Sequence, residues 1–144
     1  MPGDYRWPLL PGKGGGTIDL RHVASVAADT TDTLFLDQLA AGWYAVTNTR
    51  RQVGFGMAWP LEVFPALWFW QVYGGAHGAP WYGRTYNIAL EPFSAVQPTL
   101  VEAIAAGSAR VLEPGGSVRA RFVTVAYAGL QGVSRISPEG EVSA

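Results

Sequence analysis

The fold is most constrained by two alternating runs that are separated by a short polar turn. Residues 40–50 (AAGWYAVTNTR) alternate in side-chain type, and residues 52–59 (QVGFGMAW) alternate large side chains with nearly bare ones. A period of two places successive side chains on opposite faces of a strand, and Arg50-Arg51 lies at hairpin distance between the runs. We therefore predict an antiparallel hairpin. The large face of 52–59 is expected to fill a core, and its glycine face is expected to admit a second backbone or a ligand.

Other runs of strand type follow, and eighteen glycines and ten prolines spread along the chain supply turns between them. Residues 66–73 (ALWFWQVY) are apolar on both faces, as in a strand at the centre of a sandwich. Residues 99–107 (TLVEAIAAG) contain good helix formers and a glycine stop, which predicts one short helix. The remaining predicted strands are 17–20, 33–36, 85–91 and a pair within 108–129 around the turn Glu113-Pro-Gly-Gly. The predicted fold class is all-β: an antiparallel β-sandwich with at most one short helix.

The length of 144 residues predicts a single domain. Residues 1–16 contain three prolines and the run GKGGG, which lacks the second half of a phosphate-binding loop, so they are predicted to form an irregular lead-in. Residues 17–129 hold the predicted strands and form the sandwich domain. Residues 130–144 are weakly patterned, and we expect a weakly ordered tail there.

The composition excludes several classes of protein. The chain has no cysteine, which excludes disulfides and cysteine-based zinc or redox sites. Its net charge is −1 and its basic residues are scattered, so no surface for nucleic acid is predicted. The most apolar region, 54–76, is interrupted by prolines and polar residues, unlike a membrane-spanning helix. The first ten residues lack the apolar core of a secretory signal. We expect a cytoplasmic protein that needs no cofactor, metal, membrane or nucleic acid.

The residues best suited to carry chemistry gather in 68–91. This stretch holds three of the six tryptophans together with planar polar and ionisable side chains. Sugars present C–H patches, which aromatic rings cover, and hydroxyl groups, which planar polar groups bind. A carboxylate beside them can also transfer a proton. The candidate substrate-binding residues are Trp68, Trp70, His77, Trp81, Arg84 and Asn87, and the candidate catalytic residue is Glu91.

Each of these residues also has a purely structural interpretation. Trp68 and Trp70 are two apart and share one face, as two core residues would. His77 between glycines and Arg84 beside a strand start are commonly exposed to solvent, and Glu91 at a strand end is commonly a surface carboxylate. The residue types alone leave both interpretations open.

The order of motifs along residues 30–127 resembles the galactose mutarotase-like superfamily, and it is most similar to the aldose 1-epimerase-related proteins. The motifs are LFLDQLAAGWYAVTN, FPALWFWQVYGG, PWYGRTYNIALEPF, LVEAIAAG and RVLEPGGSVRARFVTV. The most specific part is the ordered set of ALEPF, a short helix that ends in glycine, and LEPGGS before an alternating strand. The resemblance implies a large antiparallel β-sandwich that binds a sugar on a concave sheet.

The resemblance also implies roles for individual residues. Glu91 falls on the position of the family's glutamate, which takes the proton from the anomeric hydroxyl of an aldose. A histidine protonates the ring oxygen in that family, but neither His22 nor His77 matches its motif. The chain corresponds to the C-terminal half of the family's fold. Half a sandwich leaves open strand edges and an uncovered apolar face, so we expect a homo-oligomer, a partner chain, or a fragment of a longer protein.

Three functions follow from these observations. The first is an isomerase that interconverts aldose anomers with Glu91 as the general base. The second is a protein that binds a sugar or sugar phosphate without turnover. The third is a structural β-sandwich half-domain that assembles with itself or a partner chain. Because a fold class does not determine a function, the leading prediction is the broader one: a carbohydrate-binding protein related to the aldose 1-epimerases.

Overall fold

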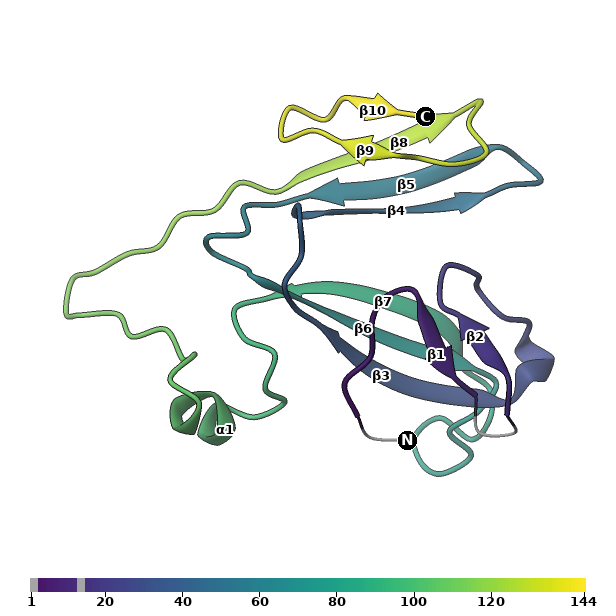
Figure 1. The fold of residues 1–144 in the computed structure, drawn as a ribbon, viewed down its shortest axis with the longest axis horizontal. Helices are drawn as coiled ribbons and strands as arrows, with labels where there is room; N and C mark the ends of the chain where they lie inside the picture. The colour runs from purple at the N-terminus through teal and green to yellow at the C-terminus, as the bar shows by residue number, and fades with distance from the viewer. Residues whose placement is uncertain (1–2, 13–14) are drawn as a thin grey trace. The chain divides into compact units, whose positions relative to one another are not determined.

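The computed structural model describes residues 3–12 and 15–144, and its secondary structure is mostly β. The strands are β1 (Leu9–Pro11), β2 (Thr17–Asp19), β3 (Thr30–Leu36), β4 (Trp43–Asn48), β5 (Val53–Ala58), β6 (Ala66–Tyr73), β7 (Tyr86–Phe93), β8 (Val123–Ala128), β9 (Arg135–Ile136) and β10 (Val142–Ser143). A 3-10 turn, η1 (Val26–Ala28), and an α-helix, α1 (Leu100–Ala105), accompany them. Antiparallel sheets packed as in a sandwich, with one short α-helix in the described part, confirm the predicted fold class (Figure 1).

The chain divides into two compact units, and each is described by itself. The first comprises Met1–Thr31 and Val72–Asn87, and the second comprises Asp32–Gln71 and Ile88–Ala144. The first unit contains β1, β2, η1 and the loop between β6 and β7. The second contains β4, β5, β8, β9, β10, α1 and the greater part of β3, β6 and β7.

In the second unit, the predicted hairpin forms as β4 and β5. The register places Asn48 opposite Val53, and the polar turn is closed by the backbone amide of Arg51, which donates to the Asn48 side-chain oxygen at 2.9 Å. β8 pairs with the other side of β5, also antiparallel, with Ala128 opposite Val53. The resulting sheet has the strand order β4-β5-β8.

The other sheet of the sandwich has the strand order β3-β6-β7, and neighbouring strands run in opposite directions (Figure 1). Its central strand, β6, has the predicted bounds and the predicted apolar character. Leu67 and Phe69 are buried on one face, and the other face, which carries two tryptophans, is half-buried. β7 continues through Pro92, beyond its predicted end. Because β7 is an edge strand, a residue without a backbone N–H is tolerated there.

The glycine face of β5 admits close neighbours, as expected, and they include side chains as well as the backbone carbonyl of Tyr44. Ile136 of β9 lies against Gly56, and the ring of Tyr127 lies against Gly54, so a Cβ atom at either glycine would collide with them. The Tyr127 hydroxyl is hydrogen-bonded to the Thr47 hydroxyl, with 2.7 Å between the oxygens. The glycines of β5 therefore leave room for a second layer of side chains to pack directly on this strand.

The prediction that the large face of residues 52–59 fills a core is confirmed only at its end, where Trp59 is 6% exposed. Val53 and Phe55 on that face remain 43% and 45% exposed, and their partners on β8, Ala128 and Ala126, are exposed as well. Alternation in side-chain size identifies the two faces of a strand, but it does not show which face is buried by another element. Here β9 packs on the small face, and the large face is left partly open.

Helix α1 begins and ends where the sequence predicts. Thr99 is the N-cap and forms a capping box with Glu102: the Glu102 amide donates to the Thr99 hydroxyl at 3.3 Å, and the Thr99 amide donates to the Glu102 carboxylate at 3.1 Å. Gly107, with a φ of 69°, follows the helix in the left-handed conformation that commonly stops one. Among the described residues, no helix has the length and apolarity that a membrane crossing requires.

Residues 108–122 form no strand, which corrects the prediction of two strands within 108–129. The predicted turn is present, because the Gly116 amide donates to the Glu113 carbonyl at 2.7 Å. Regular strand structure begins only at β8. Alternation becomes a strand when a neighbouring strand satisfies the backbone N–H and C=O groups, and no strand pairing involves this segment within the described residues. Its apolar side chains stay exposed, with Val111 at 78%.

In the first unit, β1 pairs antiparallel with β2, so the predicted irregular lead-in contains a short strand. Lys13 and Gly14 of the GKGGG run lie outside the described residues. At the end of β2, the guanidinium of Arg21 binds the Asp19 carboxylate, with 2.6 Å between Nη2 and Oδ2. The hydrogen bonds from Arg21 hold the pKa of Asp19 at about 2, below its ordinary value.

Within residues 130–144, where the sequence pattern is weak, the chain forms two short strands. β9 and β10 form an antiparallel hairpin with Ile136 opposite Val142, and Ile136 is only 3% exposed. Ser137 follows it, and its hydroxyl accepts hydrogen bonds from the amides of Glu139 and Glu141 at 3.2 Å each. The order comes from packing on β4 and β5, which a weak local pattern does not reveal.

Candidate functional site

The first predicted site residue, Trp68, is packed by other aromatic rings. Trp68 stacks on Phe93 of β7, with 3.8 Å between ring centroids and 6° between planes. Phe35 of β3 meets the same ring edge-on at 4.9 Å. The Trp68 indole N–H donates to the Ala95 carbonyl at 2.9 Å. One ring face of Trp68 is therefore packed against Phe93, and its N–H group has a protein acceptor, as the structural interpretation of this residue expects.

This stack also determines which site residues share a side of the sheet. Trp68 and Trp70 are two apart on β6, and Glu91 and Phe93 are two apart on β7. Because Phe93 lies on Trp68, strand alternation places all four on the same side. The structure thus brings Trp68, Trp70 and Glu91 together on one face of the second unit, which we call the tryptophan face.

Glu91 is half-buried in this face. Its carboxylate forms no hydrogen bond or ion pair with any residue that the structure describes. A carboxylate that is partly removed from water and lacks a protein partner is free to accept a hydrogen bond or a proton from another molecule. A general base needs this property.

The other four predicted residues belong to the first unit. His77, Trp81 and Arg84 are exposed, and Asn87 is half-buried. His77 Nε2 lies 2.7 Å from Asp29 Oδ1, and both side chains are largely exposed, at 70% and 63%. No local pattern could have predicted this pair, because 48 positions separate its members. The Arg84 amide donates to the Trp81 carbonyl at 3.0 Å, which holds these two residues in one turn.

Two buried polar atoms of the first unit lack a hydrogen-bond partner among the described residues. They are the Tyr73 hydroxyl and the side-chain oxygen of Asn87. Burial, with a smaller contribution from Tyr86, raises the pKa of Tyr73, so its hydroxyl stays protonated. A buried polar atom without a partner costs about 1–3 kcal/mol. Each of these atoms marks a place where water or a ligand group would be stabilising.

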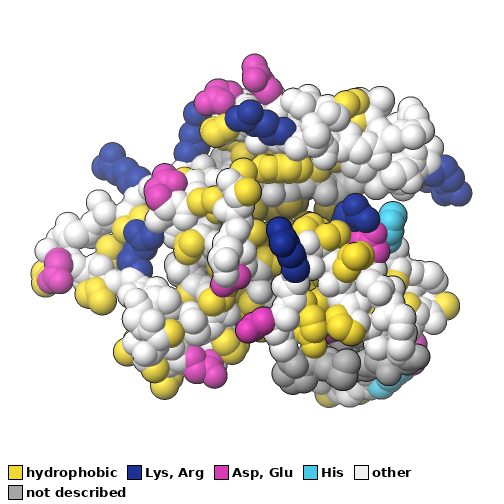
Figure 2. All heavy atoms as spheres, viewed as in Figure 1, with side chains coloured by type: hydrophobic (Ala, Val, Ile, Leu, Met, Phe, Trp, Pro, Cys, Tyr) yellow, Lys and Arg dark blue, Asp and Glu magenta, His cyan; other side chains and the backbone are white. Residues whose placement is uncertain are grey.

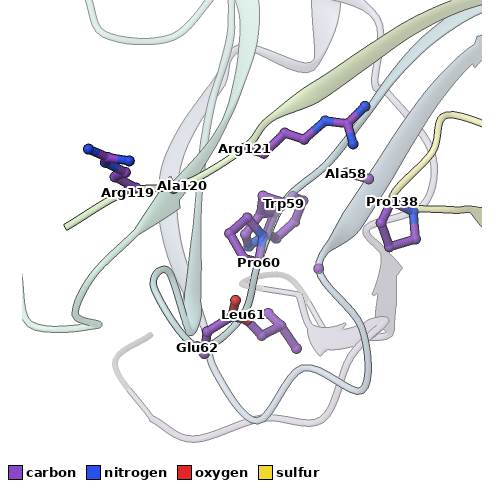
Figure 3. Close-up of a pocket in the computed structure, with 10 residues that line it drawn as sticks. Ala58, Trp59, Pro60, Leu61, Glu62, Arg119, Ala120, Arg121 and Pro138 are labelled. Atoms are coloured by element: carbon purple, nitrogen blue, oxygen red, sulfur yellow. The ribbon is translucent and has the colours of Figure 1, made fainter.

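A pocket that the sequence analysis missed opens in the second unit. Its volume is about 430 Å³, and it lies beside the end of β5 (Figure 3). Trp59, Pro60, Glu62, Arg119, Arg121 and Pro138 are among its lining residues, and none of the seven predicted site residues lines it. The signal that could have pointed to it is the spacing of Arg119 and Arg121, two arginines separated by one small residue after a Gly-Gly turn.

On the face shown in Figure 2, arginine and acidic side chains are scattered among hydrophobic ones. Across residues 3–12 and 15–144, no group of three or more His, Cys, Asp or Glu side chains is placed to hold a metal ion.

Comparison of the chain with protein-family models, with curated proteins and with solved structures finds no significant match. The resemblance to the aldose 1-epimerase-related proteins therefore stays a prediction, and the function is argued from the site.

Proposed function

We propose that this chain is a carbohydrate-binding protein and that the tryptophan face contacts the sugar. The observation that carries the proposal is Glu91: a half-buried carboxylate without a partner among the described residues, on the same side of the sheet as Trp68 and Trp70. A sugar hydroxyl would supply the hydrogen bond that Glu91 lacks, and ring C–H groups would cover exposed aromatic surface. The family resemblance points to the same residue.

Glu91 also has the chemistry to act on the anomeric centre. If the bound hydroxyl is the anomeric one, its proton passes to the Glu91 carboxylate, its oxygen becomes the carbonyl of the open-chain sugar, and the bond from the anomeric carbon to the ring oxygen breaks. The ring oxygen must gain a proton in this step. Neither His22 nor His77 matches the histidine motif of the family that the chain resembles, so we assign that proton to a water molecule, and the hydroxide that remains takes the proton back from Glu91. We therefore propose sugar binding as the main role and anomer exchange as a slow accompanying activity.

The test is a titration of ¹⁵N-labelled protein with aldoses and aldose phosphates, recording amide shifts and the rate of exchange between α and β anomers. We expect saturable shifts at Trp70 and Glu91 for at least one sugar. Glu91→Gln should weaken binding about tenfold, because a hydrogen bond to a charged group contributes about 1.5 kcal/mol. Catalysed exchange should fall on the order of a hundredfold.

Glu113→Gln is the matched control, because it removes an exposed carboxylate of the same unit. It should behave as the unmodified chain does. Absence of saturable shifts across the panel, or equal behaviour of the two variants, would contradict the proposal. In the same titration, the amides of His77, Trp81, Arg84 and Asn87 report whether those residues respond to the sugar.

The open face of β5 favours a second candidate role, assembly with further copies of the chain. Val53 and Phe55 are 43% and 45% exposed, and the edge strands β4 and β8 flank them. An exposed apolar sheet face next to free edges promotes association. We expect the average mass measured by analytical ultracentrifugation to rise with concentration, and Phe55→Ser to reduce that rise. The control Val111→Ser should leave it unchanged, and a monomer at every concentration would exclude this role.

A further inference from the structure

All the residues that line the pocket beside the end of β5 belong to the second unit. Residues 58–62 form its floor, residues 119–121 run along one side, and Pro138 lies at another (Figure 3). Its volume of about 430 Å³ falls within the range of small-molecule sites, about 300–1,000 Å³. The pocket therefore has the size to hold a compact organic molecule.

The floor of the pocket is held in place by hydrogen bonds. Trp59 is 6% exposed, its backbone amide donates to the Gly42 carbonyl at 2.8 Å, and its indole N–H donates to the Phe64 carbonyl at 2.9 Å. The Trp59 ring also contacts Tyr44, with 6.0 Å between centroids. A ligand would meet an apolar surface that is already ordered, which lowers the entropic cost of binding.

The side of the pocket formed by 119–121 is attached to this floor, although it belongs to no strand. Arg110, earlier in the same segment, donates from one guanidinium nitrogen to the carbonyls of Glu62 and Val63 at 3.1 Å each. Phe122 packs on Phe64, with 5.1 Å between ring centroids. The segment is thus fastened on both sides of Arg119 and Arg121.

Arg119 and Arg121 differ from the arginines that have structural partners. Neither forms a hydrogen bond or an ion pair with any residue in the described part of the chain, whereas Arg110 binds two carbonyls and Arg21 binds a carboxylate. Figure 3 shows the guanidinium of Arg121 extending along the Ala58 side of the pocket, while that of Arg119 points away from it. A guanidinium without a partner is suited to a carboxylate or phosphate, which it binds through paired N–H groups.

We infer that this pocket binds a small organic anion. The carboxylate or phosphate group of the ligand sits on the Arg121 guanidinium, and its apolar body lies against the floor formed by Trp59 and Pro60. Arg119 adds to the positive potential at the rim, and Glu62 is the only carboxylate among the described residues that line the pocket. This inference does not rest on the proposed sugar site, because the two sites share no residue.

The experiment uses phenyl phosphate and benzoate as probes, with phenol and inorganic phosphate as their uncharged and ring-free counterparts. Each is titrated into ¹⁵N-labelled protein while the indole N–H signal of Trp59 is followed. We expect saturable shifts with phenyl phosphate or benzoate, and the difference between them identifies the preferred anionic group. Phenol and inorganic phosphate should bind at least about tenfold more weakly, because each lacks one of the two contacts.

Arg121→Gln should weaken binding of the better probe about tenfold or more, and Arg119→Gln should weaken it less. Arg135→Gln, an exposed arginine of the same unit, is the matched control and should have no effect. Equal affinity in the Arg121 and Arg135 variants would overturn the inference. Added salt should also weaken binding to the unmodified chain, so salt-independent binding would overturn it without any variant.

Discussion

Trp68→Ala is expected to lower the free energy of unfolding by about 3–5 kcal/mol, as removal of a packed aromatic side chain commonly does. The substitution deletes the stack on Phe93 and the edge contact with Phe35. It also leaves the Ala95 carbonyl without its indole donor. Three strands and the segment after β7 lose a shared contact, so the cost should be near the upper part of this range. Urea unfolding followed by circular dichroism measures it.

Val111→Ala is the control for this measurement. Val111 is 78% exposed in the same unit, and its truncation should change the free energy of unfolding by less than about 0.5 kcal/mol. If Trp68→Ala costs no more than this control, the aromatic cluster is not a packed core. The role of Trp68 would then be limited to the ligand contact proposed for the tryptophan face.

Gly54→Ala is expected to cost about 3 kcal/mol, at the upper end of what an added methyl group costs in a filled core. The new Cβ atom would collide with the ring of Tyr127. That ring cannot move freely, because its hydroxyl is hydrogen-bonded to the Thr47 hydroxyl and to the Val46 carbonyl. Thermal and urea unfolding of the purified variant give the value.

A double-mutant cycle separates this collision from other effects of the substitution. In a Tyr127→Ala background, Gly54→Ala should cost less than about 1 kcal/mol, because the obstructing ring is gone. Gly132→Ala is the matched control, since an added Cβ atom there meets no atom within 4 Å. Purely additive costs in the cycle would mean that Tyr127 does not cover Gly54.

Local patterns predicted the elements whose partners are close in sequence. The β4–β5 hairpin follows from two alternating runs around Arg50 and Arg51, and β6 has the predicted bounds. The helix follows from a run of good helix formers that ends at Gly107, which supplies its stop. In these cases the residues that decide the structure lie within one window of the chain.

The predictions that failed concern residues whose structure depends on contact with a distant segment of the chain. The alternating residues before Val123 predicted a strand, but no partner strand lies beside them. The size pattern of β5 showed two faces, but only the position of Ile136 determines which one is covered. The same reason applies to the pocket, whose floor at Trp59 and side at Arg121 come from separate parts of the chain.

For the candidate site, the sequence predicted which residues share a face, but it did not predict the contacts that these residues make. Strand alternation correctly placed Trp68 and Trp70 on one face. It could not show that Phe93 occupies a face of the Trp68 ring, or that Glu91 would lack a partner in the described structure, because both depend on how β6 and β7 are paired.

The packing of Tyr127 and Ile136 on the glycines of β5 has a consequence for biosynthesis. Gly54 and Gly56 are translated long before Tyr127 and Ile136, the residues that lie against them. In a nascent chain, the glycines of the β4–β5 hairpin therefore stay uncovered until β8 and β9 have left the ribosome. Pairings between such distant segments form slowly, and exposed strands on an incomplete chain invite aggregation. Slow translation between β5 and β8 would prolong that vulnerable period rather than assist folding.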